Sequence, residues 1–160
     1  MKEEYDQILD DCKLELEDIK KQIEASPISR QVKYLTAYAV VRSSGAIEVT
    51  MKQMEYDWLI IGANTDAQEY LYEKIVKAST NPATDRMCEF LGRINPDKNK
   101  KFKRKLHTHG DERDKLNSLV ELRNAIAHGN SISSGINDVV SYFSAGRIVL
   151  QLLYSEMIGR

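Results

Sequence analysis

Two side chains late in the chain, Arg123 and His128, have the types and spacing that cleavage of a phosphodiester requires. RNA is cleaved when a base removes the proton of a 2′-hydroxyl group and an acid protonates the leaving 5′-oxygen. Imidazole titrates near neutral pH and suits both steps, whereas a guanidinium binds two phosphate oxygens and stabilises the charge of the transition state. The pair therefore indicates metal-independent cleavage of RNA.

The helical projection of residues 111–128 places Arg123 among apolar positions and His128 about 140° away. A guanidinium is rarely buried unless it is paired. One interpretation is an ion pair between Arg123 and a glutamate such as Glu48 or Glu121. Alone, His128 would be an ordinary histidine at the negative end of a helix dipole. The two residues together favour the functional interpretation.

The chemistry predicts a homodimer. Cleavage needs both an acid and a base, but the motif supplies one histidine per chain, His128. A two-fold axis places the same surface patch opposite itself, so it would bring two copies of Arg123 and His128 into one cleft. Each chain would then carry half of a composite site.

Helical periodicity recurs along the sequence, with breakers between the periodic segments. We expect an all-α fold, a helical bundle of four long helices plus short extra helices, in a single domain over residues 1–160. The long helices are expected at about 3–25, 30–61, 111–128 and 136–157, with short ones after residue 65 and at 84–93. A polar, basic connection is expected over residues 95–110.

The long helix at 30–61 has an unusual middle, because Gly45 lies where a bulky core residue is expected. A glycine inside a helix costs roughly 1 kcal/mol relative to alanine, so we expect another helix to approach closely there. Several large side chains of the same helix are assigned to the core: Tyr34, Tyr38, Met51, Met54 and Trp58.

Residues 98–105 carry a dense run of positive charge around Phe102. The basic residues, Lys98, Lys100, Lys101, Lys103, Arg104 and Lys105, are candidates for contact with an RNA backbone, with Phe102 stacked on a base. The alternative is a solvated loop that offsets the acidic first helix. The sequence does not decide between the two.

Composition excludes several classes of protein. The net charge of −1 supplies no long-range attraction for nucleic acid, so RNA binding must come from a local patch. His107 and His109 lack further metal ligands, and no glycine-rich phosphate loop is present, so neither a metal nor a cofactor is expected. Cys12 and Cys88 are expected to be free thiols. Without a signal region or a long apolar stretch, the chain is expected to be cytoplasmic.

The stretch 119–129 resembles the Arg-x4-6-His signature of the HEPN superfamily of helical ribonucleases, and 38–48 resembles the corresponding helix of its RiboL-PSP-type branch. The resemblance covers about residues 32–154. It implies a homodimeric endoribonuclease, often a toxin or an antiviral-defence effector, with an antitoxin or another regulatory protein as a possible partner. It implies Arg123 and His128 as catalytic residues, Asn124 as an orienting residue, and Arg42 and Glu48 in support.

Two alternatives stay open at this point. In the first, Arg123 and His128 form a structural polar pair in an inactive helical module that binds a protein or a nucleotide. In the second, the basic run binds RNA but the chain does not cleave it. New RNA ends after incubation with the protein distinguish cleavage from both alternatives.

Overall fold

Helices make up most of the chain. The computed structural model describes residues 1–159, and this part contains seven α-helices, one π-helix and no strand. The long helices are α1 (Glu3–Ala25), α2 (Gln31–Leu59), α6 (Gly110–Ala127) and α7 (Ile136–Ile158). The shorter ones are α3 (Thr65–Leu71), which continues as the π-helix η1 (Tyr72–Val76), α4 (Thr84–Ile94) and α5 (Pro96–Thr108). The prediction of an all-α bundle with four long helices is confirmed.

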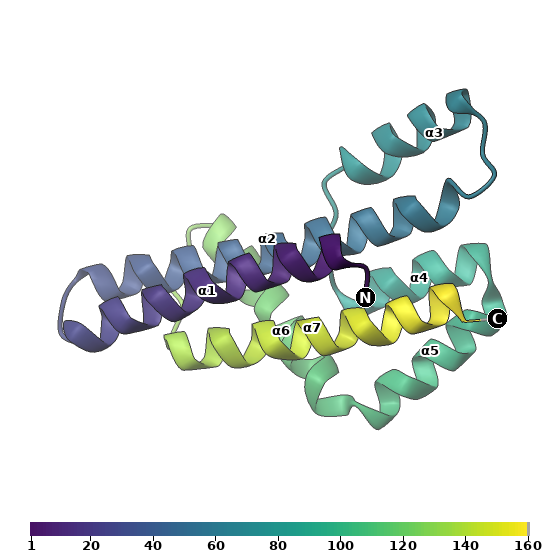
Figure 1. Cartoon of the computed structure of the whole chain (residues 1–160). Coiled ribbons are helices and arrows are strands. Elements are labelled where there is room, and N and C mark those ends of the chain that lie inside the picture. Colours follow the sequence, from purple (N-terminus) through teal and green to yellow (C-terminus); the bar gives the residue numbers. More distant parts are fainter. Residues whose placement is uncertain (160) are drawn as a thin grey trace.

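The helices α1 and α2 form an antiparallel pair, and α7 lies along both of them (Figure 1). The helix α6 packs against α2 and α7, whereas α4 and α5 pack against each other near the end of α7. Apolar residues at every third or fourth position of α1 form its buried stripe: Tyr5, Leu9, Cys12, Leu16, Ile19 and Ile23. This spacing places one face of α1 in the core, as the sequence predicts.

A small residue allows α2, α6 and α7 to meet closely, but it is not the expected one. A Cβ atom added to Gly146 would lie 2.9 Å from Cδ1 of Ile47 in α2 and 3.2 Å from Cδ1 of Leu116 in α6. Gly45, by contrast, would have no atom within 4 Å of an added Cβ. The prediction of a close approach at Gly45 is therefore wrong, and this glycine borders an open surface hollow instead.

The large side chains of α2 divide between the core and the surface. Met51 and Met54 are buried, and the Trp58 ring packs edge-on against Phe90 with the ring centroids 6.0 Å apart. Tyr34 and Tyr38 are 65% and 50% exposed, so their assignment to the core is wrong. Both tyrosines lie outside the stripe of buried positions on α2, which follows other residues of that helix.

The region expected to be a basic connection is mostly the helix α5. The Asn95 side chain accepts hydrogen bonds from the backbone N–H groups of Asp97 and Lys98, and Pro96 occupies the first turn. Phe102 and Leu106 are buried and hold the helix against its neighbours. The prediction was wrong because only these few apolar positions mark the helical period among many lysines.

Candidate active site

The end of α6 fixes the backbone of His128. This residue is the C-cap of α6, and its N–H donates to the Asn124 carbonyl oxygen at 3.0 Å. Gly129 follows at a φ of 77°, with its N–H on Ile126, and the Asn130 N–H reaches back to Ala125 at 2.9 Å. This pair of bonds is a Schellman motif, which ends a helix with a left-handed glycine. It leaves the His128 side chain exposed at a defined point of the surface.

Arg123 lies about one turn before the cap and is half-buried. Its Nη1 donates to Oδ1 of Asn124 at 3.4 Å, a long hydrogen bond that orients the guanidinium toward the neighbouring amide. Within residues 1–159, no carboxylate lies within 4.0 Å of this guanidinium. An arginine with an unneutralised charge, in the same end of α6 as an exposed histidine, has the donors to hold an anionic group.

The ion-pair interpretation of Arg123 is not what the structure shows. Glu48 Oε1 lies 3.2 Å from the Lys52 ammonium and accepts from the Thr80 N–H, also at 3.2 Å. Glu121, the other candidate, is exposed. Glu48 therefore ties α2 to the segment before α4, and no hydrogen bond among the described residues joins it to Arg123 or His128.

Arg42 faces α1 rather than the motif. Its Nε donates to Oε2 of Glu15 at 2.6 Å, and the Tyr38 hydroxyl donates to the other oxygen of the same carboxylate. These hydrogen bonds, from Tyr38 and then from Arg42, lower the pKa of the Glu15 carboxyl below its ordinary value. Within one chain the two supporting candidates, Arg42 and Glu48, thus belong to separate contacts, whereas Arg123, Asn124 and His128 share the end of α6.

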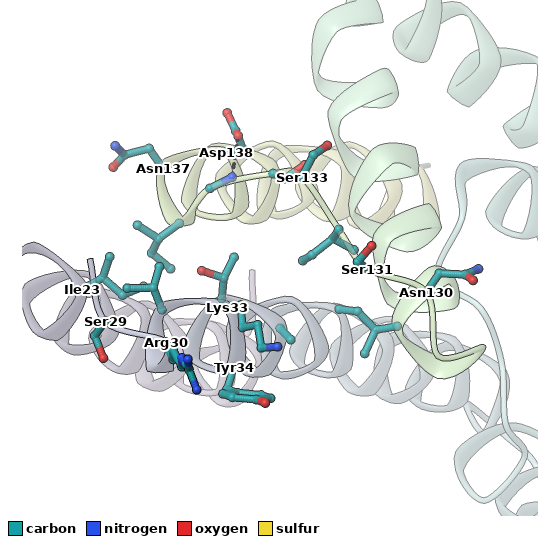
Figure 2. Close-up of a pocket in the computed structure, with 18 of the residues that line it drawn as sticks. Ile23, Ser29, Arg30, Lys33, Tyr34, Asn130, Ser131, Ser133, Asn137 and Asp138 are labelled. Carbon is teal, nitrogen blue, oxygen red and sulfur yellow. Dashed lines mark hydrogen bonds between the residues drawn. The ribbon is translucent and has the colours of Figure 1, made fainter. Parts of the chain in front are cut away.

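A large groove adjoins this end of α6. Its volume is about 1050 Å³, and it lies between the first turns of α2 and the segment from Gly129 to the start of α7 (Figure 2). Ile126 and Gly129 of the motif line one part of it, and Arg30, Lys33 and Tyr34 of α2 line another. The sequence patterns did not predict this groove. The small polar composition Asn-Ser-Ile-Ser-Ser over 130–134 was the available signal.

Comparison with known proteins shows the family of this chain. A model of the RiboL-PSP-HEPN family matches residues 7–158. The chain belongs to the RiboL-PSP-HEPN family. Neither the curated proteins nor the solved structures include a significant match to it.

The basic helix α5 of this RiboL-PSP-HEPN chain has two sides. Lys98 donates to the carbonyl of Glu156 at 2.6 Å and to that of Gly159, and the Lys105 Nζ lies 2.5 Å from the Glu156 carboxylate. These two lysines therefore bind the end of α7. Phe102 is fully buried, so the prediction that it stacks on a base is wrong. The basic side chains that are exposed are Lys100, Lys101, Lys103 and Arg104.

The distribution of unpaired cations sets two places apart. Most lysines and arginines of residues 1–159 lie within 4.0 Å of a carboxylate. In the described chain, the cations outside such pairs lie on α5 (Lys98, Lys101, Lys103 and Arg104) and around the end of α6 (Arg30, Lys33 and Arg123), apart from Lys74 of η1. Local positive charge is available there although the net charge is −1.

The remaining candidates are structural. The His109 ring Nδ1 lies 3.0 Å from the Lys105 carbonyl, and residues 1–159 contain no group of three or more potential metal ligands. Cys12 and Cys88 are free thiols, as predicted. Burial raises the pKa of Cys12 to about 11. No helix in the described part of this RiboL-PSP-HEPN chain is long and apolar enough to cross a membrane.

Proposed function

We propose that this chain is a metal-independent endoribonuclease whose catalytic residues are Arg123 and His128, with Asn124 as a positioning residue. The observation that carries the proposal is the end of α6. There, a half-buried arginine without a carboxylate partner in the described chain lies one turn from an exposed, backbone-fixed histidine. Membership of a HEPN family supports the same assignment.

In the proposed mechanism, the ribose 2′-oxygen attacks the adjacent phosphorus while His128 accepts the 2′-hydroxyl proton. The bond from phosphorus to the 5′-oxygen breaks, and His128 of the partner subunit gives a proton to that oxygen. The products are a 2′,3′-cyclic phosphate and a free 5′-hydroxyl. Arg123 donates hydrogen bonds to the phosphate oxygens, which carry additional negative charge in the transition state.

The composite site requires a homodimer, and α2 offers a surface for it. An apolar hollow of about 390 Å³ lies over Gly45 and is bordered by Tyr38, Val41 and Val49. Val41 and Val49 are 47% and 52% exposed, and with the hollow they form one contiguous apolar surface for a partner to cover. Arg42 lines the same hollow, so in such a dimer it would contact the partner subunit.

Sizing and substitution test this dimer. We expect Val49→Glu to shift the protein from dimer to monomer in light scattering and to abolish cleavage, because a charge would be buried in the interface. Leu14→Glu is the matched control, since Leu14 is an exposed apolar residue of α1 outside the hollow. An active monomeric wild-type protein would contradict the composite site.

The exposed face of α5 is proposed as a second contact to the RNA backbone. Lys100, Lys101, Lys103 and Arg104 point to solvent, whereas Lys98 and Lys105 bind α7 and are excluded from this role. Replacing the four exposed residues by alanine should weaken RNA binding and lower its dependence on salt concentration. If the salt dependence of RNA binding is unchanged, this face of α5 is a solvated surface that does not contact RNA.

We further propose a role as a toxin or an antiviral-defence effector, controlled by an antitoxin or another regulatory protein. Expression of the wild-type chain in bacteria should then arrest growth, and Arg123→Ala should relieve the arrest. The direct test of activity is incubation of the purified protein with end-labelled RNA in EDTA. We expect new ends with the wild-type chain and none with His128→Ala, at equal folded content by circular dichroism.

A further inference from the structure

Three kinds of side chain suited to one ligand line the groove beside the motif. In Figure 2, Arg30 and Tyr34 lie along the edge of α2 that is farther from Ser131 and Ser133. Arg30 and Lys33 are exposed and, within residues 1–159, have no carboxylate within 4.0 Å. Tyr34 is 65% exposed, and the Lys33 ammonium lies 4.7 Å from the centroid of its ring. Ser131 and Ser133 present hydroxyl groups from the segment that faces this part of α2.

The charges of the groove favour an anionic ligand along α2. Asp138 is the single carboxylate among the lining residues, and its Oδ2 accepts the Gly135 N–H at 2.9 Å. It caps the start of α7, away from the wall that carries Arg30 and Lys33 (Figure 2). The α2 wall is therefore positive, and the opposite wall is polar.

The groove is large enough to hold an extended ligand. Pockets for small molecules typically measure about 300–1,000 Å³, and this groove reaches about 1050 Å³. Lysine and arginine side chains contact backbone phosphates, and exposed aromatic rings stack on unpaired bases. Serine hydroxyls can exchange hydrogen bonds with ribose 2′-hydroxyl groups.

We infer that this groove binds the single-stranded RNA segment next to the cleaved bond, with phosphates on Arg30 and Lys33 and a base on Tyr34. The groove adjoins the end of α6, because Ile126 and Gly129 line it and flank His128 in the chain, whereas Arg123 and His128 themselves lie outside its lining. A strand lying in the groove therefore leads its next phosphodiester to the end of α6. The inference rests on the proposed ribonuclease function and adds the positioning of its substrate.

The test uses full-length chains that carry His128→Ala, so that RNA binding is measured without cleavage. Fluorescence anisotropy with a labelled 12-nucleotide single-stranded RNA compares this parent with Lys33→Glu and Tyr34→Ala. The matched controls are Lys74→Glu and Tyr70→Ala, because Lys74 and Tyr70 form a similar exposed cation–ring pair, 5.7 Å apart, outside the groove. A duplex of the same sequence and a polyglutamate peptide serve as competitors.

We expect Lys33→Glu and Tyr34→Ala each to weaken binding at least about fivefold, with little change in the controls. Loss of the Lys33 contact should also reduce the slope of log K against log salt by about 0.7. Equal binding by groove and control variants, or equal competition by polyglutamate, would overturn the inference.

Cleavage assays with His128 intact separate this inference from the proposed function. If the wild-type chain cleaves RNA and Tyr34→Ala cleaves it with unchanged KM, the groove inference fails and the ribonuclease proposal stands. If groove-dependent binding is found but the wild-type chain makes no new ends, the ribonuclease proposal fails and the groove stands as an RNA-binding site.

Discussion

Replacing Glu55 by glutamine should change how the stability of the fold depends on pH. Glu55 lies in α2 with no exposed side-chain surface, and its Oε2 is 3.3 Å from Nη2 of Arg86 in α4. Its Oε1 has no hydrogen-bond partner within residues 1–159. Burial raises the pKa of the carboxyl from 4.5 to about 7, against the opposing effects of Arg86 and Lys52.

The sign and size of the effect follow from this shift. The folded chain holds the proton up to about pH 7, whereas the unfolded chain releases it near pH 4.5. Between these values unfolding releases a proton, so a rise in pH favours unfolding. The stabilisation is complete below pH 4.5, is lost as the pH rises through 7, and amounts to about 3 kcal/mol in total. Glu55→Gln removes the titration and keeps the shape of the side chain.

Urea unfolding followed by circular dichroism measures this at pH 5, 6, 7 and 8, at one protein concentration. The wild-type free energy of unfolding, minus that of Glu55→Gln, should fall by about 2.5 kcal/mol from pH 5 to pH 8, because part of the stabilisation is already lost at pH 5. Arg86→Met should raise the pKa of Glu55 further and extend the fall to higher pH. A difference that stays constant or rises with pH would refute the reasoning, because Glu55 would then be ionised in the fold and stabilised by Arg86.

Three more predictions concern the cap, the basic helix and the thiols. Gly129→Ala should destabilise the fold by about 1–2 kcal/mol, since alanine disfavours a φ of 77°, and it should reduce cleavage because His128 is displaced. Unchanged urea unfolding of this variant would contradict the role of Gly129 as a cap. Phe102→Ala should lower the free energy of unfolding, measured with urea, by about 3–5 kcal/mol because the ring is fully buried. A variant of unchanged stability that is impaired only in RNA binding would instead support stacking of Phe102 on a base. A disulfide reagent at pH 8 should modify the half-buried Cys88 before Cys12, because Cys12 is buried and its pKa is about 11. Faster modification of Cys12 would contradict the packing of α1, which buries this thiol.

The long helices were predictable because each carries an apolar stripe that a single core can cover. The stripe of α1 repeats at helical spacing, and all six of its residues are buried: Tyr5, Leu9, Cys12, Leu16, Ile19 and Ile23. The helix α5 was not predictable in this way, since its core side rests on Phe102 and Leu106 alone, amid a run of lysines. Tyr34 and Tyr38 were misplaced because residue type, rather than angular position on α2, decided their assignment.

The candidate site was predictable only in part. Residue chemistry and spacing pointed to Arg123 and His128, and the family match covers both positions. Whether a carboxylate neutralises Arg123 depends on the packing of α2 against α6, which the sequence does not specify. The groove combines residues 30–37 with residues 126–138, and only the folded chain brings these two segments together.

The most direct test of the central claim is cleavage of a defined RNA that carries one modified ribose. After a cleavage site has been mapped, the same oligonucleotide is made with a 2′-deoxyribose 5′ to the cleaved bond and incubated with the wild-type chain in EDTA. Attack by the 2′-hydroxyl predicts that the all-ribose substrate yields a 2′,3′-cyclic phosphate by mass spectrometry and that the modified substrate stays intact. Cleavage of the modified substrate, or ends that carry a 3′-hydroxyl, would contradict the role proposed for Arg123 and His128.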